Sequence, residues 1–97
     1  MKKTYYHATS YSNLSSIISE GLKVGTDHII YLCERATDSL KFAYVHGVKN
    51  CLVCEVKLDE KDVKETFDHS QEFFKCKCFG YDKTISSLDI KFWRYSL

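Results

Sequence analysis

The chain has no proline, only four glycines and no internal repeat or low-complexity segment. Nothing in the sequence therefore marks a boundary between two domains. A chain of 97 residues is also of the size that forms one hydrophobic core. We expect residues 1–97 to fold as a single domain, whose elements have to be found from hydrophobic periodicity and turn residues.

Neither sign of charge predominates, because 14 basic residues face 13 acidic ones and the net charge is +1. This balance excludes the broad basic surface that duplex nucleic acid or an acidic membrane requires. The sequence also lacks a run of about 18 apolar residues, and no signal-peptide core follows the basic start at Lys2 and Lys3. We expect a cytoplasmic protein without a membrane partner.

The chain has five cysteines, an odd number that argues against a disulfide framework and for reduced thiols. The spacings of Cys51 with Cys54 and of Cys76 with Cys78 superficially resemble halves of a zinc site. However, residues three apart on a strand point to opposite faces, and Cys76 and Cys78 share their face with Phe74, as small buried residues do. We therefore expect no metal.

The periodicity predicts an α+β fold, a small mixed or antiparallel sheet with two short helices in the N-terminal half. Ser10 is a suitable N-cap for the first helix, Leu14, Ile17 and Ile18 form its apolar stripe, and Gly21 is expected to end it. The second helix is expected at about 37–46, from the spacing of Ala36, Leu40, Ala43 and Tyr44. Strands are expected at 3–7, 28–33, 51–58, 71–79 and 90–95, with a short extended piece near 63–67 and a turn at 80–83.

Three side chains are candidates for chemistry. His7 ends the first strand, Tyr31 lies in the second, and Glu72 alternates with Phe74 and Cys76 so that its carboxylate should border an apolar face. Each also has an ordinary explanation: a partly exposed histidine, a core tyrosine whose hydroxyl finds one partner, and a carboxylate at the wet end of a strand.

Taken together, the motifs around these residues resemble the ADP-ribosyltransferase superfamily. The segment Tyr6-His7-Ala8-Thr9-Ser10 is similar to the His-Gly-Thr opening of the NAD site, with alanine in place of glycine. The segment Ile30-Tyr31-Leu32-Cys33, with Ser39 eight residues after the tyrosine, resembles the Gly-Ile-Tyr-Phe segment. Ser70-Gln71-Glu72 is placed like the glutamate of the His-Tyr-Glu branch, which includes diphtheria toxin and the poly(ADP-ribose) polymerases.

The resemblance implies a minimal NAD-dependent mono-ADP-ribosyltransferase without a metal. Glu72 would be the catalytic carboxylate that stabilises positive charge on the ribose as nicotinamide leaves. His7 would bond the hydroxyls of the adenosine-side ribose, and Thr9 would support the same loop. Tyr31 would stack on the nicotinamide ring, and Ser39 would bond its carboxamide. The acceptor, whether protein, nucleic acid or small molecule, has no readable signature.

Three other functions remain open at this point. The chain is short for the family, so the fold could bind NAD or a related nucleotide without catalysis. An RNA 2′-phosphotransferase has a similar His-Gly-Thr opening but needs several arginines, and this chain has only Arg35 and Arg94. A structural domain that meets a partner through Phe92, Trp93 and Tyr95 is the third alternative.

Overall fold

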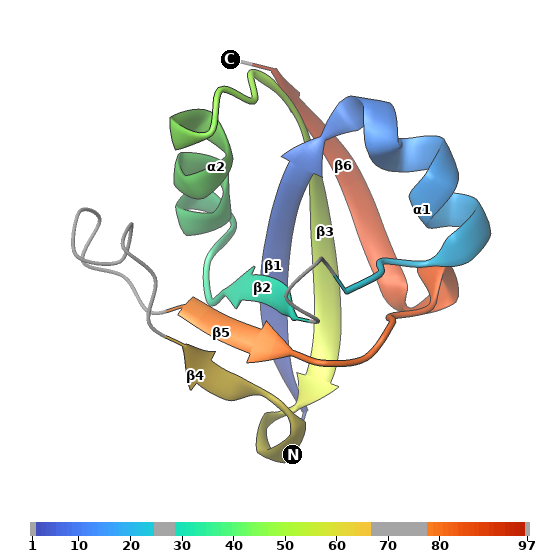
Figure 1. The fold of residues 1–97 in the computed structure, drawn as a ribbon, viewed down its shortest axis with the longest axis vertical. Coiled ribbons are helices and arrows are strands. Elements are labelled where there is room, and N and C mark those ends of the chain that lie inside the picture. The colour runs from blue at the N-terminus through green and yellow to red at the C-terminus, as the bar shows by residue number, and fades with distance from the viewer. Residues whose placement is uncertain (1, 25–28, 67–77, 97) are drawn as a thin grey trace.

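The computed structural model describes residues 2–24, 29–66 and 78–96 and confirms the predicted α+β class (Figure 1). In this described part of the chain, six strands form one antiparallel sheet, accompanied by two α-helices and three short 3-10 turns. The strands are β1 (Lys2–Ser10), β2 (Ile30–Cys33), β3 (Asn50–Asp59), β4 (Lys64–Thr66), β5 (Cys78–Tyr81) and β6 (Ile90–Ser96). The helices are α1 (Leu14–Glu20) and α2 (Ala36–Val45), and the 3-10 turns are η1 (Tyr11–Asn13), η2 (Glu60–Asp62) and η3 (Ser87–Asp89).

The sheet has the order β4-β5-β2-β1-β3-β6 and consists of two groups of strands that run in clearly different directions (Figure 1). In one group β1 pairs with β3 along its whole length, and β3 pairs with β6. In the other group β5 lies between β2 and β4. The two groups are joined where β1 meets β2 in a single residue pair, Tyr6 with Cys33. We call this junction the seam.

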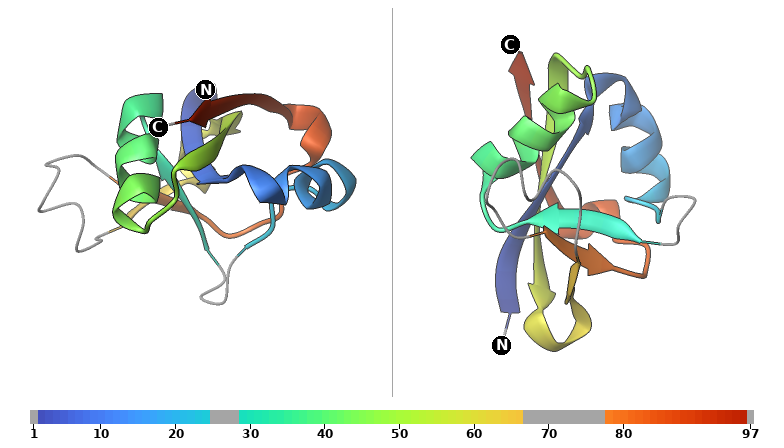
Figure 2. Two further views of the ribbon diagram at one scale, coloured as in Figure 1. Left: turned by 90° about the horizontal axis from the view of Figure 1, so that it is seen from above. Right: turned by 60° about the vertical axis from the view of Figure 1, so that its left-hand side comes forward.

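The two helices lie on opposite sides of the β1-β3-β6 group (Figure 2). On the α1 side, Tyr5, Leu52 and Cys54 pack with Ile17 and with Leu32 of β2 in the main core. On the α2 side, Val53 is expected from the sequence to share a solvated face with Glu55 and Lys57. That prediction is wrong, because Val53 is completely buried, like Cys51 on the same face. The N-terminal half of β3 is therefore buried on both of its faces.

Ser10 is an N-cap, as predicted, but of η1: its hydroxyl accepts a hydrogen bond from the backbone N–H of Ser12. The N-cap position of α1 itself is Asn13, whose side chain makes no capping hydrogen bond. The helix ends as predicted at Gly21, which has a φ of 82° and donates its N–H to the Ile17 carbonyl at 2.8 Å. Leu22 then pairs with Ile85 in an isolated antiparallel bridge. The prediction for Ile18 is wrong, since its side chain is 53% exposed. A helix of this length covers the sheet with Leu14 and Ile17 only.

The second helix begins and ends within a residue of its predicted bounds. Ala43 is buried as expected, but Tyr44 is 58% exposed. The buried face instead carries two polar residues, Asp38 and Ser39. Buried polar residues require partners. Asp38 has Arg35 and Lys41 nearby, and Ser39 bonds the Ala36 carbonyl.

Other boundaries differ from the sequence expectation. The first strand continues to Ser10, because β3 pairs with it over its full length. Gly80 was expected in a turn but lies within β5, opposite Tyr31 on one side and Lys64 on the other. Most of the strand predicted at 71–79 lies outside the described residues. Within the described part of the chain, no helix is long and apolar enough to span a bilayer.

Candidate functional site

His7 lies beside the seam and links the two groups of strands. Its Nδ1 is 2.7 Å from the backbone carbonyl of Tyr31 on β2. Because a carbonyl can only accept, Nδ1 carries the proton and Nε2 retains its acceptor lone pair when the ring is neutral. Burial lowers the pKa of His7, and the hydrogen bond to Tyr31 opposes this effect only in part. At neutral pH the side chain is therefore a neutral acceptor held in one orientation.

A cavity of about 210 Å³ opens between the seam and α2, and we call it the Ser39 cavity. Three of the residues predicted from the sequence, His7, Tyr31 and Ser39, line it together. Its other described lining residues are Tyr6, Ala8, Leu32, Cys33, Phe42, His46 and Cys78. A mostly apolar lining with a few convergent polar groups is typical of small-molecule sites. A flat heterocycle with one polar substituent suits this lining.

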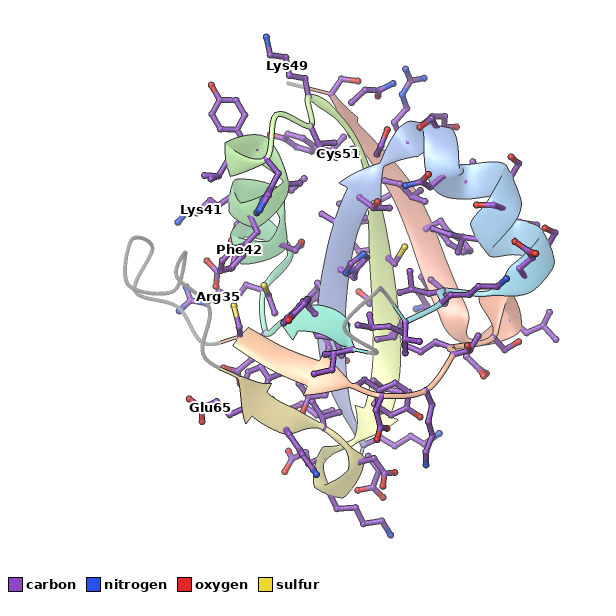
Figure 3. All side chains as sticks on the ribbon, viewed as in Figure 1. Arg35, Lys41, Phe42, Lys49, Cys51 and Glu65 are labelled. Atoms are coloured by element: carbon purple, nitrogen blue, oxygen red, sulfur yellow. The ribbon has the colours of Figure 1, made fainter. Side chains whose placement is uncertain are left out.

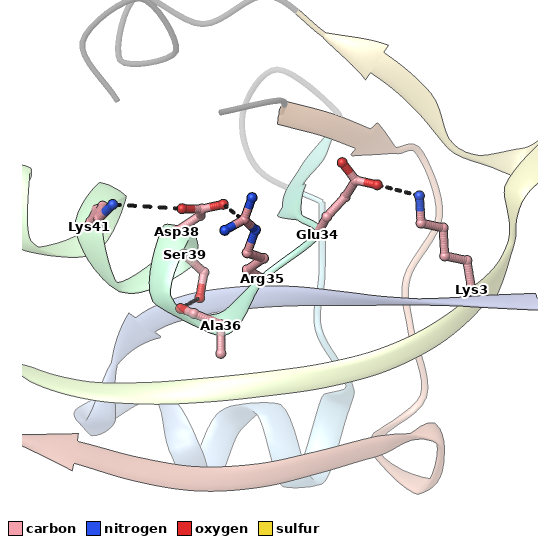
Figure 4. A network of polar contacts seen from close by, with 7 residues as sticks. All are labelled: Lys3, Glu34, Arg35, Ala36, Asp38, Ser39 and Lys41. Carbon is pink, nitrogen blue, oxygen red and sulfur yellow. Dashed lines mark hydrogen bonds and ion pairs between the residues drawn. The ribbon is translucent and has the colours of Figure 1, made fainter. Parts of the chain in front are cut away.

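Ser39 lies in the first turn of α2 (Figure 4) and lines the Ser39 cavity. The Ser39 hydroxyl donates to the Ala36 carbonyl at 2.7 Å, so its oxygen lone pairs remain as acceptors. The carboxylate of Asp38 is 3.9 Å from the guanidinium of Arg35 and 3.9 Å from the ammonium of Lys41, both largely exposed. Because both cations are exposed, these pairs contribute little to stability. Figure 3 shows Arg35, Lys41 and Phe42 on the α2 side of the molecule.

A hydrogen bond connects the segment between β2 and α2 with the N-terminal end of β1. The Glu34 carboxylate accepts a hydrogen bond from the Lys3 ammonium (Figure 4), and this bond raises the pKa of Lys3. The pair thus connects the two groups of strands at a second place besides the seam.

Thr9 lines a different hollow, of about 220 Å³, which lies between β1 and α1. Asn13 lines it as well and donates from its side-chain amide to the Thr9 hydroxyl at 2.8 Å. His7 borders both this hollow and the Ser39 cavity. Four of the five predicted site residues thus lie around two adjacent hollows that share one histidine.

The fifth predicted site residue, Glu72, lies outside the described residues. In the sequence it falls between Thr66, the last residue of β4, and Cys78, the first of β5. Those two residues are directly paired across the strands, and Cys78 lines the Ser39 cavity.

Phe42 and His46 belong to the cavity wall but are not among the predicted site residues. A signal for them exists in the sequence. Ser39 and Phe42 of α2 and His46, which directly follows the helix, are spaced i, i+3 and i+7, so they lie along one stripe. His46 is anchored there by donation from its Nδ1 to the Phe42 carbonyl at 2.7 Å.

A larger hollow, of about 570 Å³, contains none of the predicted site residues. It lies at the C-terminal end of β3, where lysines and carboxylates alternate along its wall, including Lys57, Asp59, Asp89 and Lys91. Size alone does not make it the better candidate, because mixed charges around an open hollow are well satisfied by water. The Ser39 cavity has the more specific arrangement.

In residues 2–24, 29–66 and 78–96 the remaining polar clusters do not form a second candidate centre. Cys51 and Cys54 lie on opposite faces of β3, as predicted, since Cys51 is opposite Ser10 and Cys54 is opposite His7. Among the described residues no group of three potential metal ligands occurs. Arg94 lies over the Tyr11 ring at 4.5 Å and donates to the Asn50 side chain, so this guanidinium is engaged away from the cavity.

No family model matches the chain, and no curated protein and no solved structure matches it either.

Proposed function

We propose that the protein is an NAD-dependent mono-ADP-ribosyltransferase, with Glu72 as its catalytic carboxylate. The observation that supports this most strongly is the convergence of His7, Tyr31 and Ser39 on one cavity. These residues are 8 to 32 positions apart in the sequence, and they were selected for their motifs alone. The common cavity of these three residues supports the proposal, because the motifs that carry the resemblance require their side chains to surround one ligand.

The two hollows suit the two ends of NAD. The nicotinamide ring would enter the Ser39 cavity against Tyr31, whose side chain is 40% exposed and has a ring face suited to a cationic heterocycle. The carboxamide N–H would donate to the Ser39 hydroxyl oxygen. The adenosine side would extend toward Thr9 and Asn13, and a ribose hydroxyl would donate to Nε2 of His7. A neutral His7 suits this role, because a protonated ring could not accept.

In the reaction, the bond between the ribose C1′ and the nicotinamide nitrogen breaks, and nicotinamide leaves with the bonding electron pair. A bond forms between C1′ and an oxygen or nitrogen of the acceptor, which loses a proton. Positive charge builds up on the ribose before the new bond is complete, and the Glu72 carboxylate would stabilise this charge. The same carboxylate can take up the acceptor's proton. We place this activity in the cytoplasm, because the odd number of cysteines argues against a disulfide framework and a reducing compartment keeps thiols reduced.

The first test is the release of nicotinamide from NAD by the purified protein, followed by chromatography. We expect Glu72→Gln to lower the rate by about 10²- to 10³-fold, the usual cost of one transition-state stabilising group. Glu65→Gln, which changes an exposed carboxylate on β4, is the matched control and should keep the wild-type rate. An unchanged rate in Glu72→Gln refutes the catalytic assignment. Binding of NAD by the wild type without release of nicotinamide would instead identify a non-catalytic binding module.

The second test measures the binding of NAD, whose nicotinamide ring carries a positive charge, by calorimetry. Stacking of a cation on an aromatic ring contributes about 0.5–2 kcal/mol, so Tyr31→Ala should weaken binding by about two- to thirtyfold. Tyr44→Ala is the control, because Tyr44 is also an exposed tyrosine but is absent from the described lining of the cavity. Equal affinities of the two variants would exclude Tyr31 as the stacking residue.

A further inference from the structure

Two cysteines lie directly opposite each other on neighbouring strands. Cys33 is the last residue of β2 and Cys78 the first residue of β5, and the register of the antiparallel pair places them in one row. Opposite residues of an antiparallel pair have Cα atoms about 4.5 or 5.5 Å apart, depending on the hydrogen-bonding pattern. Both spacings fall within the range of about 4.4–6.8 Å that disulfides bridge. The Cα spacing of this pair is therefore compatible with a disulfide.

The same two residues border a cavity, which gives small molecules a route to them. Both side chains are buried with respect to the bulk solvent, yet both line the Ser39 cavity beside Tyr31. Neither residue forms a disulfide in the structure. Burial within a strand pair and contact with a cavity are separate observations, and together they distinguish this pair from an ordinary buried cysteine.

We propose that Cys33 and Cys78 form an oxidisable dithiol in the wall of the Ser39 cavity and that a low-molecular-weight disulfide converts them to an intrachain disulfide. The proposal does not depend on the proposed transferase activity.

The chemistry balances with glutathione disulfide as the oxidant. One cysteine thiolate attacks a sulfur of glutathione disulfide, which forms a mixed disulfide with the protein and releases the first glutathione. The second cysteine thiolate then attacks the sulfur of the first cysteine, and the second glutathione thiol leaves. One S–S bond has formed in the protein and one has broken in the oxidant. The two protons of the cysteine thiols are carried by the two glutathione thiols.

The other described cysteines should not react in this way. Cys51 and Cys54 point to opposite faces of β3, and they are fully buried. Burial raises the pKa of Cys54 to about 12 and also raises that of Cys51, so neither thiolate forms readily at neutral pH. In a reducing compartment, disulfides that do form are mostly transient and serve redox sensing. A reversible bond between Cys33 and Cys78 is of that kind.

Trypsin provides a sharp test, because lysines and arginines separate the cysteines. Residues 24–35 contain only Cys33, residues 78–83 contain only Cys78, and residues 50–57 contain both Cys51 and Cys54. The wild-type protein is incubated with glutathione disulfide, alkylated, digested and analysed by mass spectrometry. We expect peptides 24–35 and 78–83 to appear joined with the loss of two hydrogen atoms, and to separate after treatment with dithiothreitol.

Two variants serve as controls for this experiment. Cys78→Ser should lose the joined peptide and leave Cys33 as a mixed disulfide with glutathione, which shows that Cys33 is reached by the oxidant. Cys54→Ala should keep the joined peptide. The wild-type digest tests the bond between Cys33 and Cys78 even if a variant does not fold. Joined peptides that involve residues 50–57, or no joined peptide after oxidation of the native protein, would overturn the proposal.

Discussion

Gly21 offers the clearest test of how the fold is held together, through the substitution Gly21→Ala. The residue has a φ of 82° and a ψ of 176°, a region of backbone conformation that is essentially restricted to glycine. An alanine Cβ at this position would lie 2.5 Å from the backbone oxygen of Ile85. That oxygen accepts the hydrogen bond from the Leu22 N–H at 2.8 Å, which closes the bridge between the two segments. The substitution therefore strains the backbone of residue 21 and pushes apart the paired segments at Leu22 and Ile85.

The magnitude follows from these two effects. A residue forced into this backbone region costs about 1–3 kcal/mol. Loss of one or both backbone hydrogen bonds of the Leu22 and Ile85 bridge adds about 0.5–1.5 kcal/mol for each bond. We expect Gly21→Ala to lower the free energy of unfolding by about 1.5–6 kcal/mol. Since a domain of this size is stable by only about 5–15 kcal/mol, a large part of the total would be lost.

Gly47→Ala is the matched control for this prediction. Gly47 has a φ of 84°, close to that of Gly21, but a Cβ there would meet no atom within 4 Å. Only the backbone strain remains, which costs about 1–2 kcal/mol. Urea unfolding followed by circular dichroism measures both variants, and the slope against urea should stay unchanged. If Gly21→Ala loses no more stability than Gly47→Ala, the contact with Ile85 does not have the role we assign to it.

Two further predictions concern the site and the core. Because burial lowers the pKa of His7 below 6.5, the unfolded chain binds a proton before the folded chain does as the pH falls. The contribution of His7 to stability is therefore complete above pH 6.5 and is lost as the pH falls from 6.5 through the folded pKa. Urea titrations should show a flatter pH dependence in His7→Gln than in His46→Gln, and equal slopes would contradict this. In the core, Leu32→Ala should lower the free energy of unfolding by about 2–5 kcal/mol, since the Leu32 side chain is completely buried. Leu88→Ala is the control: this side chain is 93% exposed, so the free energy of unfolding should change by less than about 0.5 kcal/mol. Calorimetry measures both variants.

Local signals in the sequence predicted most of the elements correctly. The Ser10 cap and the Gly21 stop bracket the first helix because both depend on groups within a few residues. The errors occurred where distant segments decide burial. Val53 has the alternation of a half-exposed strand, but α2 covers its face. Gly80 has the composition of a turn, but it pairs on both sides with other strands.

In the candidate site, too, local motifs predicted some features, and contacts between distant segments determine the others. His7, Tyr31 and Ser39 were predicted from motifs, and the structure brings them to one cavity. No local pattern could indicate that the imidazole of His7 bonds a carbonyl of β2, because this contact depends on how the two groups of strands meet. Nor could the sequence place Cys33 opposite Cys78, since register between strands 45 residues apart is set by tertiary pairing.

The order of strands in the sheet has a consequence for how the chain folds. The first strand in the sequence, β1, is a central strand, and its two neighbours, β3 and β2, come later in the chain. Early in folding β1 therefore has no local hairpin partner. It can pair only with segments that are far away in the sequence. Contacts of such long sequence separation slow folding. We expect the rate-limiting step to be the docking of β3 onto β1, with β6 added afterwards at the edge.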